Sequence, residues 1–201
     1  MKKWLGFFGA AVLLIAALAV LPIHGEAGIY DNVIRLHVLA NSDSEEDQAL
    51  KLMVRDAVVK ESERLLAEVS DRDAAERILR ESLPDLKATA EQALASAGAT
   101  AEVSVTLTEE SYPTREYEQF AFPAGKYLSL RVMIGEADGK NWWCVLFPPL
   151  CLSAATDARE QEIVCLSAGL TGEQYRLIAD TDSTKYKLRF KILEVAEELF
   201  G

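Results

Sequence analysis

A single stretch between residues 32 and 59 most constrains the fold, because it predicts a buried strand joined by a sharp polar turn to a long amphipathic helix. In its first part apolar residues alternate with other residues, which is the period-two pattern of a strand. In its second part apolar residues recur at helical spacing. These apolar positions are Ile34, Leu36 and Val38 in the strand and Leu50, Met53, Val54, Ala57 and Val58 in the helix. The stretch therefore predicts a helix that packs against a strand, with an exposed corner between them.

The corner carries local signals of its own. Residues 40–42 (Ala-Asn-Ser) predict a turn rich in short side chains that hydrogen-bond their own backbone. Ser42 precedes Glu45 by three residues, which fits a capping box and predicts where the helix begins, and Ser44 and Asp47 repeat that spacing. The carboxylates of this first turn complement the helix dipole and are typical of a solvated helix start.

Further helices are predicted on both sides of the middle of the chain. The helical pattern restarts after residues 70–71 and again over residues 85–97, with Gly98 in the position of a helix-terminating glycine. Thr171 and Gln174 have the spacing of another capping box, before a short helix. A last amphipathic helix is predicted from Lys187 to the end of the chain.

Strands are predicted where apolar residues alternate or form short runs. They cover residues 102–108, 127–134 and 141–147, and the almost wholly apolar third strand is predicted to lie in the centre of the sheet. The Asp138-Gly139 pair predicts a turn with positive φ before that strand. The fold class is therefore α+β, an antiparallel sheet of about four strands, three of them in a meander, with helices packed mainly on one face.

The N-terminus predicts export. Two lysines precede an apolar run over residues 4–21, and small residues follow it up to a cleavage position after Ala27. The run is also nearly long enough to span a bilayer, so residues 1–27 are either a signal peptide or an N-terminal membrane anchor. Residues 30–201 then form a single exported domain, which contacts the membrane through the apolar segment if that segment is retained.

The composition excludes two classes of partner. The chain has 201 residues and a formal net charge of −11. Nucleic acid and an anionic membrane surface are both disfavoured, because neither gains from meeting a protein of like charge. The length fits one domain with a substantial core.

Three cysteines leave at least one thiol unpaired within the chain. Cys144 lies in an apolar run and is interpreted as a small buried hydrophobic residue. Cys151 and Cys165 flank a polar loop, and a disulfide between them is one hypothesis for an exported protein.

No residue pattern predicts catalysis, a cofactor or a metal. His37 is the one histidine outside the leader region, and the chain has no HExxH, CxxC, GxSxG, P-loop or GxGxxG motif. A structural role for His37 is therefore the main interpretation. The alternative from another class is an exported Cys-dependent hydrolase that combines His37 with a thiol such as Cys144. A third hypothesis is an envelope scaffold without signalling output.

Two stretches invite an interaction hypothesis. The aromatic-rich loop from residue 109 to residue 127 is broken by proline and glycine, so it either packs over the core or meets a partner. Consecutive tryptophans place one indole on each face of a strand, and an exposed tryptophan is a frequent interface anchor. The candidate partner-binding residues are Asn41, Ser42, Asp43, Tyr112, Arg115, Tyr117, Trp142 and Trp143. The competing interpretation is that they are turn, capping and core residues.

Three segments together resemble one family. They are IRLHVLANSDSEEDQALKLMVRDAV at 34–58, YPTREYEQFAFPAGKYLSLRVMIGEADGKNWWCVLFPPLC at 112–151 and KLRFKILE at 187–194. They are similar to stage II sporulation protein R of endospore-forming bacteria. This resemblance implies a non-enzymatic signalling protein that is made in the forespore and exported into the space between the forespore and mother-cell membranes. Its implied partner is the membrane-embedded aspartic protease that processes pro-sigma-E in the mother cell.

Overall fold

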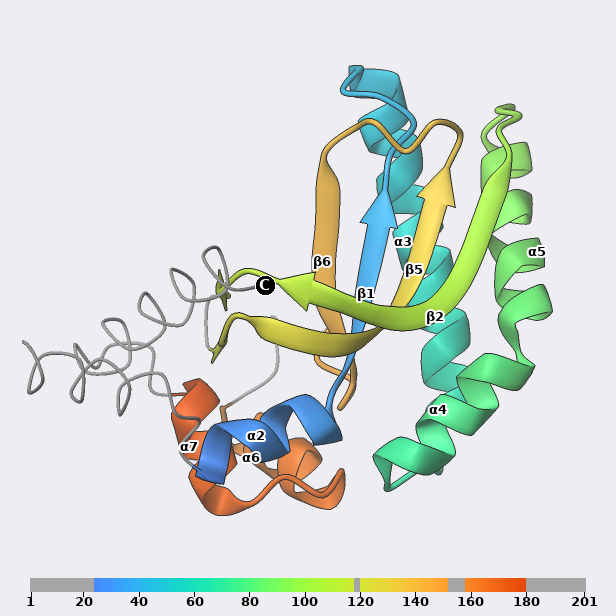
Figure 1. The fold of residues 1–201 in the computed structure, drawn as a ribbon. Helices are drawn as coiled ribbons and strands as arrows, with labels where there is room; N and C mark the ends of the chain where they lie inside the picture. Colours follow the sequence, from blue (N-terminus) through green and yellow to red (C-terminus); the bar gives the residue numbers. More distant parts are fainter. Residues whose placement is uncertain (1–23, 118–119, 152–157, 180–201) are drawn as a thin grey trace, which may run out of the picture.

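The structure is a computed structural model that describes residues 24–117, 120–151 and 158–179. Within this part of the chain the fold is α+β, with a four-stranded sheet, a two-stranded ribbon and six helices. Two long helices lie behind the sheet and are joined by a short helix near its lower end, where three further short helices also gather (Figure 1).

The main sheet has the strand order β2-β5-β1-β6. Its strands are β1 (Ile34–Leu39), β2 (Val103–Tyr112), β5 (Gly125–Ile134) and β6 (Asn141–Phe147). β1 pairs in parallel with β5 and antiparallel with β6, while β2 pairs antiparallel with β5. Parallel pairing of β1 and β5 is possible because the helices between them provide the long crossover that it requires.

Two expectations about the sheet are therefore wrong. The sheet is mixed rather than antiparallel, and β6 lies at an edge rather than in the centre, because β1 inserts between β5 and β6. The apolar sequence of β6 has another cause. Its second half is covered on both faces, with Leu146 in one core cluster and Val145 in the other.

The back face of the sheet packs on α3 (Glu45–Leu66), α4 (Arg72–Glu81) and α5 (Leu83–Ser96). Strand residues of alternate positions point into this layer, as the period-two pattern predicts. Gly98 follows α5 with φ +75°, so its predicted role as the residue after a helix end is confirmed. The fully buried apolar residues of this core include Ile34, Leu36, Val38, Val54, Val58, Leu79, Leu86, Leu130 and Val132.

A second core lies on the front face, at the lower end of the sheet (Figure 1). It joins α2 (His24–Asn32), α6 (Ala158–Ser167), α7 (Gly172–Ala179) and the ribbon of β3 (Arg115–Glu116) and β4 (Ala121–Phe122) to the sheet. Its buried members are Ile29, Val33, Tyr112, Phe120, Phe122, Tyr127, Val145, Leu150, Cys165, Leu170 and Ile178. Helices therefore cover the back face and one end of the front face.

The capping box before α7 is confirmed. The Thr171 N–H donates to Gln174 Oε1 at 2.7 Å, and the Gln174 N–H donates to Thr171 Oγ1 at 3.2 Å. Two other expectations lie outside the described residues, namely the apolar run at 4–21 and the amphipathic helix from Lys187. Among the helices of the described residues, none has both the length and the hydrophobicity of a membrane span.

Candidate functional site

The polar corner forms as a network that fixes the start of α3. Ser44 is the N-cap residue, and its Oγ accepts a hydrogen bond from the Asp47 N–H at 3.1 Å. The expected cap at Ser42 and Glu45 is therefore wrong by two residues. Ser42 instead donates to the Asp47 carboxylate and accepts a bond from the Ser44 N–H at 3.2 Å, so its side chain is used inside the turn.

The corner is also bonded to the turn that precedes β6. Asn41 Oδ1 accepts a hydrogen bond from the Glu136 N–H at 3.0 Å, and Asp43 Oδ1 accepts one from the Lys140 N–H at 2.7 Å. The Gly139 N–H donates to the Ala40 carbonyl at 3.0 Å. These bonds join two loops that lie almost one hundred residues apart in the sequence.

Glycines allow the two loops to approach each other. A Cβ atom on Gly135 would collide with the Asn41 side chain, and one on Gly139 would collide with the Ser42 carbonyl. Positive φ occurs at Gly135 (+56°) and Ala137 (+55°), so the predicted positive φ at Asp138-Gly139 is wrong. The close contact, rather than the turn type, explains why Gly139 is required.

Charged groups reinforce the corner. Hydrogen bonds from Ser42 and Asn41 lower the pKa of the Asp47 carboxyl, which favours its ionised form as an acceptor. Lys51 is buried and donates from Nζ to the Lys140 carbonyl at 2.9 Å, and burial lowers the pKa of its ammonium group. Asn41, Ser42 and Asp43 thus all have structural partners, and a partner-binding role for them stays a prediction.

The front face carries a second polar group of residues, which we call the front cluster: Arg35, His37, Glu110, Tyr112, Arg115, Tyr117, Arg131, Asn141 and Trp143. β2 and the start of β5 curve strongly across this face (Figure 1). Because of that curvature, Glu110 lies 3.2 Å from His37 Nδ1 and also 3.3 Å from Arg131 Nε. The front cluster meets the corner at Asn141, whose Oδ1 lies 2.9 Å from His37 Nε2.

The neighbours of His37 determine which of its ring nitrogens carries a hydrogen. An ionised Glu110 can only accept, so Nδ1 carries the hydrogen that faces it. Nε2 then either accepts from the amide nitrogen of a rotated Asn141 or carries a second hydrogen to the amide oxygen. Burial raises the pKa of Glu110, but hydrogen bonds from His37 and Ser129 and the charge of Arg131 outweigh it, so the net shift lowers the pKa. His37 is buried and bonded on both nitrogens, which agrees with a structural role.

Arg35 is fully buried at the base of the front cluster. Its Nε donates to the Cys144 carbonyl at 3.1 Å, and its Nη2 donates to the Tyr117 hydroxyl at 2.9 Å. Its guanidinium carbon lies 4.4 Å from the ring centroid of Tyr112, with Phe122 and Tyr127 slightly farther away. Nη1 has no hydrogen-bond partner, and no ion pair joins Arg35 to a carboxylate within the described residues. The guanidinium charge is therefore stabilised mainly by aromatic faces and neutral acceptors.

One feature of the sequence hints at this role for Arg35. Arg35 lies in a mainly apolar strand, on the face opposite Ile34, Leu36 and Val38. A buried arginine at such a position needs partners that stabilise its charge. Neither its aromatic neighbours nor its burial follow from that hint, because they come from β2, β4 and β5.

The aromatic loop packs over the core more than it faces solvent. Tyr112 is 2% exposed and its hydroxyl lies 2.7 Å from Ser129 Oγ, which favours the core-packing interpretation at this position. Burial raises its pKa. Tyr117 is partly buried and donates from its hydroxyl to the Trp143 carbonyl at 3.2 Å, which blocks part of the outer edge of β6.

The two tryptophans lie on opposite faces of β6, as expected from their adjacency. Trp143 is in the front cluster, where the Arg115 guanidinium carbon lies 3.6 Å from its ring centroid. Trp142 lies against α3 with 36% of its surface exposed, and the guanidinium carbon of Arg55 is 4.2 Å from its ring centroid. Both indoles therefore combine an arginine with some solvent access, a composition frequent at interfaces.

The disulfide joins Cys144 to Cys151, with Cα atoms 5.3 Å apart, so the hypothesis of a Cys151–Cys165 bond is wrong. The chain turns back after β6, where the Leu150 N–H donates to the Val145 carbonyl at 3.2 Å, and this returns Cys151 to the strand. Cys165 is free and buried, and burial raises its pKa to about 12. None of the three cysteines of the chain therefore presents a thiolate near neutral pH, which argues against a Cys-dependent hydrolase.

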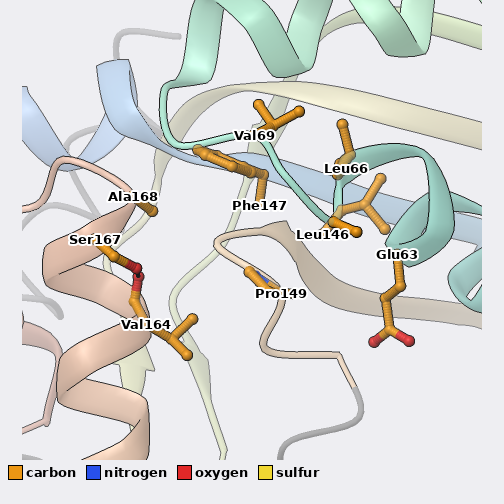
Figure 2. A pocket seen from close by; sticks show the side chains of 10 residues that line it. Glu63, Leu66, Val69, Leu146, Phe147, Pro149, Val164, Ser167 and Ala168 are labelled. Atoms are coloured by element: carbon orange, nitrogen blue, oxygen red, sulfur yellow. Dashed lines mark hydrogen bonds between the residues drawn. The ribbon is translucent and has the colours of Figure 1, made fainter.

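An apolar groove of about 530 Å³ lies between the end of α3, the end of β6 and α6 (Figure 2). Figure 2 shows Leu66, Val69 and Phe147 on one side of the groove, and Val164 of α6 and Ala168, which follows α6, on the other. Glu63 is the one ionisable residue in its lining, and burial raises the pKa of that carboxyl.

No cluster of three or more metal-ligating side chains occurs in the part of the chain that the structure describes.

Comparisons with known proteins identify the family. The family model for stage II sporulation protein R matches residues 30–157. A protein of Bacillus subtilis (strain 168) named stage II sporulation protein R is 43% identical over 137 residues, which cover 67% of this chain and 61% of that protein. No solved structure is significantly similar to the chain. The chain therefore belongs to the stage II sporulation protein R family.

Proposed function

We propose that this protein is an exported forespore signal that activates the membrane-embedded aspartic protease responsible for processing pro-sigma-E in the mother cell. The observation that carries the proposal is family membership, through the match over residues 30–157. That match includes the corner, the front cluster and the disulfide. The signal acts without catalysis of its own, by contact with the protease in the space between the two membranes.

Two features of the chain support an extracytoplasmic signal. The sequence of residues 1–27 has the charged start, apolar run and small-residue exit of a secretory leader. The disulfide between Cys144 and Cys151 is typical of proteins in oxidising compartments. The acidic net charge of −11 disfavours nucleic acid as the target of the signal.

The exposure of the candidate residues guides our choice of a contact surface. Tyr112 is buried. The side chains of Asn41, Ser42 and Asp43 are accessible to solvent but hydrogen-bond within the fold, whereas Arg115, Trp142 and Trp143 offer guanidinium and indole surface with some solvent access. We therefore place the receptor contact on the β6 side of the molecule, around these three residues. Alanine at Arg115 and Trp142 should reduce protease activation in a folded protein.

Reconstitution in a vegetative cell tests the function. The chain, the protease and the sigma pro-protein are co-expressed, and cleavage of the pro-protein is followed on immunoblots. We expect cleavage that requires this chain and is lost when residues 1–27 are deleted. The matched control is a protease with its catalytic aspartates replaced by asparagine. No cleavage with all three proteins present, and with the protease shown to be competent, would reject the proposal.

A further inference from the structure

The apolar groove of Figure 2 continues onto an exposed apolar part of α6. Val164 and Ser167 of α6 line the groove, and Ile163 is the helical neighbour of Ser167, four positions earlier. Ile163 is 59% exposed, and Leu166, three positions further on, is 42% exposed. Large apolar side chains that adjoin a groove are typical of a surface that receives another apolar face.

The groove also contains a carboxylate that lacks a cation among the described residues. Glu63 is partly buried, and its carboxylate takes part in no ion pair or hydrogen bond within the part of the chain that the structure describes. Loss of hydration disfavours an ionised carboxylate unless a positive group lies close to it. An occupant of the groove should therefore combine an apolar face with a positive charge beside that face.

The sequence that follows α7 has this combination. Its large apolar residues recur at the spacing with which an amphipathic helix anchors in a groove, at Leu188, Ile192, Val195 and Leu199. Lys191 lies three positions after Leu188 and four before Val195, so in a helix it is the neighbour of both. The segment therefore matches the groove in apolar character and in charge.

A helix over residues 188–199 needs support from another surface. It has about three turns, and an isolated helix of that length is marginal in water. Its charges are also in the unfavourable order, because the helix dipole favours acidic residues first and basic residues last. Here the basic residues come first and the acidic ones last, at Lys187, Arg189, Lys191, Glu194, Glu197 and Glu198.

The connection from α7 is long enough to reach the groove. α7 packs against α6 and ends at Ala179. Residues 180–187 span up to about 26 Å when they are extended, whereas α6 is about 15 Å long. Segment 188–199 can therefore return from the end of α7 to the groove that α6 lines.

Other segments outside the described residues fit the groove less well. The apolar run at residues 4–21 and the connection at residues 152–157 contain no lysine or arginine, so neither supplies a cation to Glu63. The connection also has only one large apolar residue, Leu152.

We propose that residues 188–199 form a helix that docks in this groove, with the Lys191 ammonium group beside the Glu63 carboxylate. The proposal goes beyond the proposed function and does not depend on it, because protease activation enters none of its tests. Its consequence is that the groove and the Ile163 side of α6 form an internal contact and are not part of the receptor surface.

Photo-crosslinking in the exported full chain tests the occupant. Ser167 is replaced by photo-reactive benzoylphenylalanine, and the linked peptides are identified by mass spectrometry. Ser96 is the matched control position. Both serines are exposed, each is the last residue of its helix, and each donates from its hydroxyl to the carbonyl three residues earlier. We expect a link from position 167 to residues 188–199 at the mass of a single chain, and no such link from position 96.

Each other result overturns the proposal. A link at the mass of two chains means that a second copy occupies the groove. A link to residues 1–23, to another protein or to lipid means that a different partner occupies it. The absence of any link from position 167, or the same link from position 96, means that residues 188–199 do not dock there.

Hydrogen exchange provides a second test that keeps the groove free of a bulky probe. Ile163→Asp should raise the exchange rate of the amides of residues 188–199 at least about tenfold. Leu52→Asp is the control, because Leu52 is 37% exposed on α3, about three turns before Glu63. Exchange of α5 in the same samples reports global stability. A rate in residues 188–199 that is unchanged by Ile163→Asp, or equally raised by Leu52→Asp, overturns the proposal.

A charge exchange tests the ion pair. Glu63→Lys should raise the exchange rate of residues 188–199, because it places like charges together. Adding Lys191→Glu should restore the slow rate, whereas adding Arg189→Glu, on the other side of the apolar stripe, should not. Restoration by both double variants, or by neither, overturns the placement of Lys191 beside Glu63.

Discussion

The Asp43 carboxylate accepts a hydrogen bond from the backbone N–H of Lys140, 97 residues later in the chain, at 2.7 Å. This bond holds the loop after β1 against the turn before β6. Asn41 does the same for Glu136, so two side chains that resemble surface recognition residues act as connectors between loops. Their effects on signalling should therefore follow their effects on stability.

Removing the Asp43 carboxylate should destabilise the fold. Asp43→Ala leaves the Lys140 N–H without its acceptor, and we expect a loss of about 1 kcal/mol in the free energy of unfolding. Asp43→Asn keeps an oxygen in place and should lose less. Urea unfolding followed by fluorescence measures both variants. Equal losses in the two would mean that the bond contributes nothing and that the charge matters instead.

The close approach of the two loops predicts a strong effect at Gly135. Gly135→Ala adds a Cβ that collides with Asn41, in addition to the cost of a left-handed conformation at φ +56°. Gly98→Ala is the matched control, since Gly98 has φ +75° but no atom within 4 Å of the added Cβ.

We expect about 1 kcal/mol of destabilisation for Gly98→Ala from backbone strain. Gly135→Ala should lose a further amount of about 1–3 kcal/mol from the collision. Thermal unfolding by calorimetry compares the two. If Gly135→Ala is no less stable than Gly98→Ala, the packing of Gly135 against Asn41 is incorrect.

The environment of Glu110 predicts a loss of stability in acid. Its folded-state pKa lies below the ordinary value of 4.5, so ionised Glu110 stabilises the fold at pH values above 4.5. That contribution is lost as the pH falls through the folded-state pKa. Unfolding free energies of the wild type and Glu110→Gln should therefore differ most above pH 4.5 and converge below it. A difference that stays constant across this range would exclude the linkage.

The disulfide assignment predicts a specific thiol count and pairing. Peptide mapping under non-reducing conditions should recover a linked Cys144–Cys151 peptide. A thiol reagent should react slowly with the native protein, because Cys165 is buried with a pKa of about 12, and with one thiol per chain after unfolding. Cys151→Ser should lower the free energy of unfolding by about 2–3 kcal/mol. Recovery of a Cys151–Cys165 peptide would overturn the assignment.

Arg35 predicts that lysine is a poor replacement for arginine in a buried aromatic environment. An ammonium group cannot donate to Cys144 and Tyr117 while it also lies flat on the aromatic rings. Arg35→Lys should lower the free energy of unfolding by about 1–3 kcal/mol and expose the loop around Tyr117 to proteolysis. Arg77→Lys on the exposed side of α4 should change neither quantity. Unchanged proteolysis in Arg35→Lys would mean that Arg35 does not hold the loop.

Local structure followed closely from the sequence, because residue periodicity reports which face of an element is buried. The alternation of Ile34, Leu36 and Val38 matches the back core, and the predicted bounds of the strand at 141–147 agree with β6. The capping box predicted at Thr171 and Gln174 is also present, because Thr171 is the one residue there that fits the capping pattern. It failed at the start of α3, because Ser42 and Ser44 both fit and only their surroundings decide between them.

Neighbour relationships could not be predicted in the same way. Periodicity shows which side of a strand is buried, but it does not show which strand lies next to it, so the central position of β1 was missed. The exposure of Tyr112 depends on the curvature of β2 over the front face, which no local pattern encodes. The cysteine pairing was missed for a related reason, because it depends on the return of the chain after Phe147.

The central position of β1 also determines when the sheet can be completed. β1 is formed from residues 34–39, but the residues that pair with it lie at 128–133 in β5 and at 141–147 in β6. A chain delivered from its N-terminus must therefore keep this apolar strand unpaired while about one hundred further residues emerge, since no earlier described strand pairs with it. During that interval the unpaired edges and apolar side chains of β1 are available for contacts with other chains, so the order of synthesis makes β1 the strand of the sheet most at risk of aggregation.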